Sequence, residues 1–81
     1  MMMSARVPGG VGRCLRELRK ALGWRQAELA RAIGMSTTGL SRIETGRMRP
    51  EAATIRRALG ALGFSSDAAR VLEILMERGV L

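Results

Sequence analysis

The sequence of 81 residues lacks histidine and contains one cysteine, Cys14. A disulfide framework needs pairs of cysteines and a zinc finger needs a cluster of Cys and His, so neither can support the fold. Without histidine, and with acids that fit helix ends and ion pairs, no nucleophile and base can be brought together, so an enzyme is not expected. We expect no cofactor and no metal, and we expect Cys14 to be a small buried hydrophobic residue.

Long apolar runs are also missing. All of them are far shorter than the roughly 20 residues that cross a bilayer, and the first residues, MMMSARVPGGVG, lack the apolar centre of a signal peptide. We therefore expect a cytoplasmic protein with no membrane partner. An alternating apolar pattern of strand length is absent too, which predicts an all-α fold. A chain this short forms one small domain, for which dimerisation is a common support.

Positive charge is concentrated in the first part of the chain. The formal net charge is +7. Residues 1–49 carry ten basic and three acidic side chains, whereas residues 50–81 carry four of each, so the whole excess lies in residues 1–49. Such a distribution suits a polyanionic partner such as a nucleic acid. A basic surface that serves only solubility is the alternative.

Helical periodicity predicts five helices that are separated by Gly and Pro. The first is expected from about Val11 to Leu22, with Gly23 as its stop. The others are expected at about 26–33, at about 37–45, from Pro50 in a first turn to Gly63, and from a Ser65 or Ser66 cap to about Arg78. The residues expected to face inward in the first four helices are Val11, Leu15, Leu18, Leu22, Leu29, Ala30, Ile33, Leu40, Ile43, Ile55, Ala58, Leu59 and Leu62.

The link between the second and third helices consists only of Gly34, Met35 and Ser36. Gly34 is expected to end the second helix in a left-handed conformation, Met35 to enter the core, and Ser36 to cap the third helix. So short a turn makes the helices cross steeply, and the small residue that the crossing requires is Ala30. This is the pattern of a helix-turn-helix.

The sequence resembles the phage-repressor and Cro type of helix-turn-helix domain, also called the XRE family, over about residues 11–63. A cluster of matches at fixed spacing is specific for the fold. The resemblance implies a compact five-helix bundle whose third helix lies in the major groove of double-stranded DNA while the second crosses the backbone. The matching residues are Arg19, Gln26, Glu28, Leu29, Ala30, Gly34, Ser36, Leu40, Ser41, Ile43, Glu44, Gly46 and Pro50.

Base contacts are expected on the exposed face of the third helix. A Thr methyl group can pack on a thymine methyl, and an Arg guanidinium can donate to O6 and N7 of guanine. Gly39 weakens this helix by about 1 kcal/mol relative to Ala, and it either lets the backbone approach DNA or stands where nothing packs. The base contacts that the resemblance implies are Thr37, Thr38, Ser41 and Arg42.

Phosphate contacts are expected around the same helix. Gln26 matches a family residue that contacts a phosphate and braces the recognition helix, and arginines in the flanking loops suit the same role. Arg25 stands where a capping Ser, Thr or Asn is common, so the second helix is expected to lack an N-cap side chain. The predicted phosphate contacts are Gln26, Arg25, Arg47 and Arg49.

Glu44 is unusual for a helix that faces DNA. An acid at the end of this helix repels phosphate and is unfavourable at the negative C-terminus. In members of the family the acid at this place pairs with an Arg of the first helix, and Arg19 occupies the corresponding position. The resemblance therefore implies a structural ion pair that holds the first helix to the third.

The C-terminal helix is expected to dock through Ala68, Val71, Leu72 and Leu75. Further apolar residues widen its apolar arc beyond what docking needs, and an exposed arc of this kind often marks a subunit interface. A frayed tail with scattered surface apolar residues is the alternative. The predicted dimer interface consists of Ile74, Met76, Val80 and Leu81.

Together these observations predict a sequence-specific DNA-binding transcriptional regulator, a repressor or autoregulator, that binds a two-fold operator as a homodimer. Two-fold symmetry would place the recognition helices about 34 to 36 Å apart. The alternative is a protein-interaction module on the same fold, an antitoxin or a coactivator, with a toxin or polymerase as partner. The expected organisation is a flexible segment at 1–10, a DNA-binding core at 11–63 and a dimerisation helix at 64–81.

Overall fold

The computed structural model describes residues 10–79, which form five α-helices and no strand. This confirms the predicted all-α fold, and the ends of the helices differ from the predicted ones by one or two residues. The predicted N-terminal segment, 1–10, lies outside the described residues except for Gly10, which begins the first helix. The helices are α1 (Gly10–Ala21), α2 (Gln26–Ala32), α3 (Thr37–Glu44), α4 (Ala52–Ala61) and α5 (Ser66–Glu77).

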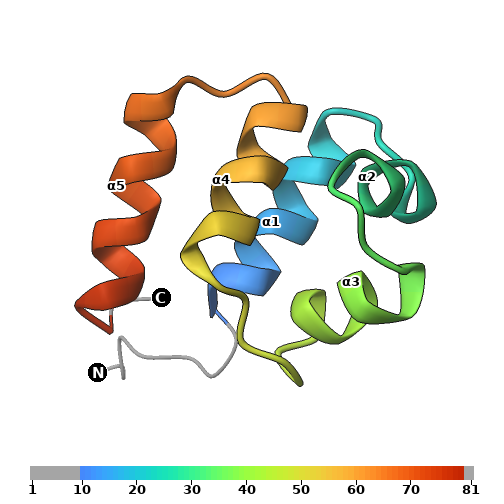
Figure 1. Ribbon diagram of the computed structural model, residues 1–81, viewed down its shortest axis with the longest axis horizontal. Helices are drawn as coiled ribbons and strands as arrows, with labels where there is room; N and C mark the ends of the chain where they lie inside the picture. The colour runs from blue at the N-terminus through green and yellow to red at the C-terminus, as the bar shows by residue number, and fades with distance from the viewer. Residues whose placement is uncertain (1–9, 80–81) are drawn as a thin grey trace.

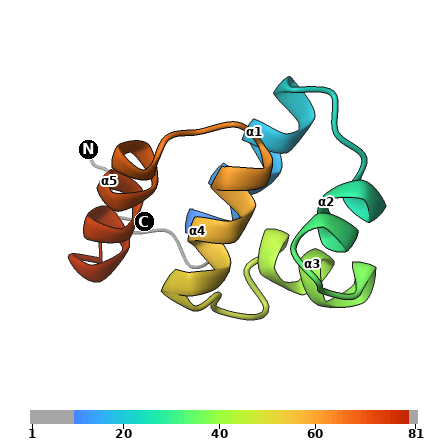
Figure 2. The same cartoon turned by 45° about the horizontal axis from the view of Figure 1, so that its top comes forward.

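The helices are arranged around a central pair. α1 and α4 occupy the middle of the bundle, α2 and α3 lie at one end, and α5 lies at the other (Figures 1 and 2). Apolar side chains from all five helices meet between them, which is the burial that stabilises so small a domain. The core consists of Val11, Leu15, Leu29, Ala30, Ile33, Leu40, Ile43, Ile55, Ala58, Leu59, Leu62, Ala69 and Met76.

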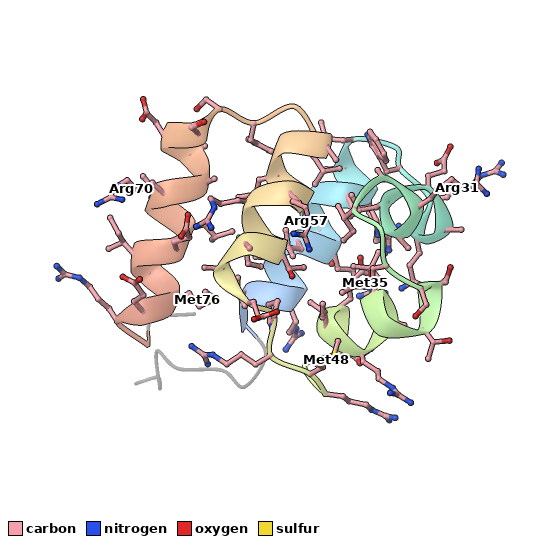
Figure 3. All side chains as sticks on the ribbon, in the orientation of Figure 1. Arg31, Met35, Met48, Arg57, Arg70 and Met76 are labelled. Carbon is pink, nitrogen blue, oxygen red and sulfur yellow. The ribbon has the colours of Figure 1, made fainter. Side chains whose placement is uncertain are left out.

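The turn between α2 and α3 has the predicted conformation. Gly34 is left-handed, with φ of 72°, and the Met35 N–H donates to the carbonyl of Ala30 at 2.9 Å. Met35 packs against the core between the two helices (Figure 3). Ser36 caps α3, because its Oγ accepts from the N–H of Gly39 at 3.0 Å. Ala30 is 1% exposed under the crossing, so the helix-turn-helix is confirmed.

Three smaller expectations, two for burial and one for a helix start, were wrong. Leu22 is 49% exposed, because α1 ends one residue earlier and the chain turns away at Gly23. Pro50 is buried ahead of α4, whose first helical residue is Ala52. Cys14 is only partly buried, although that burial disfavours the thiolate and raises the pKa of its thiol.

α5 docks through a stripe that overlaps the predicted one at Leu72, which packs against the core as expected. Ala69 and Met76 are 4% and 6% exposed, whereas Val71, expected to face inward, is 57% exposed. Met76 lies between α5 and α4 (Figure 3), so its assignment to the dimer interface was wrong. Apolar residues stand at helical spacing along both stripes, and periodicity alone cannot choose between them. The exposed large apolar side chains of α5 are Val71 and Ile74.

Candidate nucleic-acid interface

α1 approaches α3 most closely at Gly12. A Cβ atom at this position would overlap the carbonyl oxygen of Ile43 and lie 2.7 Å from its carbonyl carbon. Both atoms belong to the backbone of α3, so no side-chain movement can make room. Gly12 therefore fixes the distance between the two helices. This role of Gly12 was not predicted, although a glycine inside an apolar helical stripe was an available signal.

The predicted partners Arg19 and Glu44 form a buried, two-pronged ion pair. Arg19 Nε donates to Glu44 Oε2 at 2.8 Å, and Arg19 Nη2 donates to Oε1 at 3.0 Å. The third nitrogen, Nη1, donates to the carbonyl of Trp24 at 2.8 Å. Gln26 Nε2 also donates to Glu44 Oε1, at 3.0 Å. Both carboxylate oxygens are thus occupied, and Glu44, only 1% exposed, presents no free negative charge to a ligand.

Gln26 is held in place by the same network at the start of α2. One hydrogen of its amide goes to Glu44, which leaves the other N–H available for a ligand. The preceding Arg25 makes no side-chain cap, as expected, and remains exposed. Glu28 accepts from the Arg25 N–H at 2.7 Å, which satisfies one donor at this helix end.

The predicted base contacts lie together on one side of α3. Leu40 and Ile43 are buried, so Thr37, Thr38 and Arg42 are exposed and Ser41 is partly exposed. An open depression of about 620 Å³ runs along them. Arginine and hydroxyl groups within such a hollow can donate to phosphates or base edges, whereas they offer no nucleophile with an adjacent base. The depression is lined by Gln26, Thr37, Thr38, Ser41, Arg42, Thr45 and Arg47.

Known proteins with similar sequences extend this assignment. The family model described as a helix-turn-helix domain matches residues 11–72, from α1 into α5. The chain belongs to the helix-turn-helix family, of the phage-repressor or XRE type. The matched region extends from α1 into α5. The helix-turn-helix itself consists of α2, the turn and α3.

Relatives of this helix-turn-helix protein include small proteins of similar length. An uncharacterized HTH-type transcriptional regulator of Bacillus subtilis, YazB, is 41% identical over 56 residues, which are 69% of this chain and 81% of YazB. The ImmF control region 10 kDa protein of Bacillus phage phi105 is 34% identical over 70 residues, 85% of this chain and 78% of the phage protein.

Longer relatives share only the domain. An uncharacterized HTH-type transcriptional regulator of Mycobacterium tuberculosis is 40% identical over 53 residues, which are 65% of this chain but 21% of the mycobacterial protein. The chain therefore spans about a fifth of the length of that relative.

Arg49, a predicted phosphate contact, is exposed and also reaches α5. Its Nη2 donates to the carbonyl of Met76, at the end of α5, over a long 3.4 Å. Arg47, by contrast, lines the depression beside α3. The backbone N–H groups of Arg47 and Met48 both donate to the carbonyl of Arg42, at 2.8 and 3.0 Å. The loop after α3 is therefore folded back so that Arg47, rather than Arg49, is directed to the depression.

Two further residues of α3 and its end have roles that sequence analysis did not assign. Thr45 lines the depression, and its Oγ1 donates to the carbonyl of Ser41 at 2.8 Å. A Cβ on Gly39 would stand 3.1 Å from Ser36 Oγ and 3.2 Å from Met35 Cγ. The interpretation that nothing packs at Gly39 is therefore wrong, because its small size leaves room for the serine cap.

The helix-turn-helix domain offers hydrogen-bond donors and cations at this surface. No group of three or more His, Cys, Asp or Glu in residues 10–79 could hold a metal ion. Within the same residues, none of the five helices has the length and apolar character that crossing a membrane requires.

Proposed function

We propose that this chain is a sequence-specific DNA-binding regulator of transcription that inserts α3 into the major groove. The observation that carries the proposal is the depression of about 620 Å³, which is lined by the exposed face of α3 together with Gln26 and Arg47. Side chains that suit base edges lie along the helix, and groups that suit phosphates lie beside them. This is the distribution that a helix-turn-helix uses on duplex DNA.

The names of the relatives support a role in control of transcription. YazB is named as an HTH-type transcriptional regulator, and the phage relative as a protein of a control region. We propose that this chain is a cytoplasmic repressor or autoregulator, which acts by occupying a promoter that polymerase would otherwise bind. Selection of bound duplexes from random DNA at physiological salt tests this function. It should return a two-fold motif, and a pool without enrichment would contradict the proposal.

Base recognition and phosphate binding should be separable at two arginines. Arg42→Ala should cost about 1 to 3 kcal/mol on the selected operator and relax the preference at one base pair of each half-site, with little effect on scrambled DNA. Arg47→Ala should weaken binding to both DNAs equally and lower the salt slope by about 0.9. Anisotropy titrations at several salt concentrations measure both quantities. Equal weakening of both DNAs by Arg42→Ala would make Arg42 a phosphate contact.

We further propose that α5 forms a two-fold dimer through its exposed apolar side chains. Val71 and Ile74 stand three residues apart, so they share one face of α5. α5 lies at the opposite end of the bundle from α3 (Figures 1 and 2), which leaves it accessible when DNA is bound. Val80 and Leu81, also predicted at this interface, lie outside the described residues.

Charge on this face should produce a folded monomer. The double variant Val71→Glu with Ile74→Glu is expected to sediment as a monomer, to keep its helical circular dichroism and to bind the operator much more weakly. Arg57→Ala is the control, because Arg57 is exposed on α4 and does not belong to this face of α5. A wild-type protein that remains monomeric at tens of micromolar would contradict the dimer and favour a heterologous partner, as in an antitoxin.

A further inference from the structure

A second depression, of about 490 Å³, adjoins the first on the side of α1. The two share Gln26, Ser41 and Thr45, so they lie side by side from the start of α3 across its end to α1. Three residues line the second depression only: Glu44, at the end of α3, and Arg13 and Arg16, which form its wall on α1. Neither arginine was assigned to DNA by sequence analysis.

We propose that Arg13 and Arg16 bind phosphates of the duplex whose major groove holds α3, so that the DNA interface extends onto α1. The inference rests on the proposed function, and it adds a second helix to the phosphate-binding surface. Three observations support it: the charge of this wall, the way in which it is held, and its position beside the surface of α3.

Among residues 10–79, the positive charge of the wall is only weakly paired. Arg13 has no hydrogen-bond or ion-pair partner among residues 10–79. Arg16 lies 3.7 Å from Glu17, and with side chains 48% and 71% exposed this surface pair contributes little. Glu44, the acid in the lining, is occupied by Arg19 and Gln26 through both carboxylate oxygens. The second depression therefore presents net positive charge to solvent.

The position of the wall is fixed from both ends of α1. Gly12, which directly precedes Arg13, places the backbone of α1 against Ile43 of α3. Arg19, about two turns further on, ties α1 to Glu44 at the end of α3. Arg13 and Arg16 are three residues apart and share a face between these two points. Their guanidinium groups are thus carried by a helix that contacts α3 near both of its ends.

The shape of the two depressions favours a long polyanion over a single phosphate ion. Both depressions are open, and side by side they extend from α3 to α1. A duplex whose groove holds α3 has its phosphates arranged along each groove edge, and arginines are the usual protein partners of such phosphates. A strand that leaves the groove beside Thr45 would pass the α1 wall.

A structural role for the two arginines is the competing explanation. They line the second depression together with the C-terminal end of α3, and cations near a helix C-terminus stabilise the helix. The variants Arg13→Ala, Arg16→Ala and the double variant separate the two roles. If the arginines bind phosphate, each single variant should lose about fivefold in affinity at 0.15 M salt, and the double variant about thirtyfold. The loss should be equal for the selected operator and for a random-sequence duplex, and the melting temperature should not change.

Salt dependence gives the decisive readout. The slope of log affinity against log salt should fall by about 0.9 for each arginine removed, while Arg70→Ala on α5 should leave it unchanged. An unchanged salt slope in the double variant would overturn this inference but not the proposed function. If its melting temperature were also lower, the two arginines would have a structural role. A wild-type protein that binds neither duplex, even at low salt, would overturn both.

Discussion

Glu44→Ala is expected to lower the free energy of unfolding by about 3 to 5 kcal/mol. The substitution would leave Arg19, a residue only 8% exposed, without its charged partner, and Gln26 would lose its anchor. For a domain of this size such a loss is a large share of the total stability. Urea unfolding followed by circular dichroism measures it.

Two further variants isolate the contribution of the ion pair. Gln26→Ala removes one hydrogen bond from Glu44 and should cost only about 1 kcal/mol. The apolar pair Arg19→Met with Glu44→Leu removes both charges, and it should be more stable than Glu44→Ala alone because no buried charge is left unpaired. An unchanged urea midpoint in Glu44→Ala would show that the pair does not hold α1 to α3.

Gly12→Ala is expected to destabilise the domain by about 1 to 3 kcal/mol or more, the cost of an overpacked contact. Its Cβ would overlap the Ile43 carbonyl, and only movement of α1 away from α3 can relieve the contact. The same movement would displace Arg13 and the Arg19 clamp, so DNA affinity should fall as well. Thermal unfolding and a DNA titration of the same preparation measure the two effects.

Gly60→Ala provides the matched control. Gly60 lies inside α4, and a Cβ atom added to it would have no neighbouring atom within 4 Å, so alanine should stabilise the helix by about 0.5 to 1 kcal/mol. The same substitution in two helices thus has opposite expected signs. A stabilising effect of Gly12→Ala would mean that α1 and α3 are not in close contact.

The helices and the turn could be predicted because their signals are local. Gly34 and Ser36 define the turn through their own backbone preferences, and the stripes of α1 to α4 each have one consistent apolar face. The partnership of Arg19 with Glu44 came from the family resemblance, because 25 residues separate the two. No local rule connects them.

The docking face of α5 and the contacts between helices could not be predicted, because they depend on how the helices pack together. Both stripes of α5 are apolar, so the packing of α4, and not the sequence pattern, places Met76 inside and Val71 outside. Gly12 and Arg13 acquire their roles only through the approach of α1 to α3. The contact between Arg49 and the Met76 carbonyl of α5 has the same origin, because only the fold brings residues 27 positions apart together.

The most direct test of the central claim is amide chemical-shift mapping of the ¹⁵N-labelled protein with a random-sequence duplex at low salt, followed by the selected operator. If α3 enters the major groove, the largest shifts should occur in α3, at Gln26 and at Arg47, with further shifts in the first turns of α1 and none on the exposed face of α5. Shifts that cluster on α4 and α5, or an absence of shifts with both duplexes, would contradict the account.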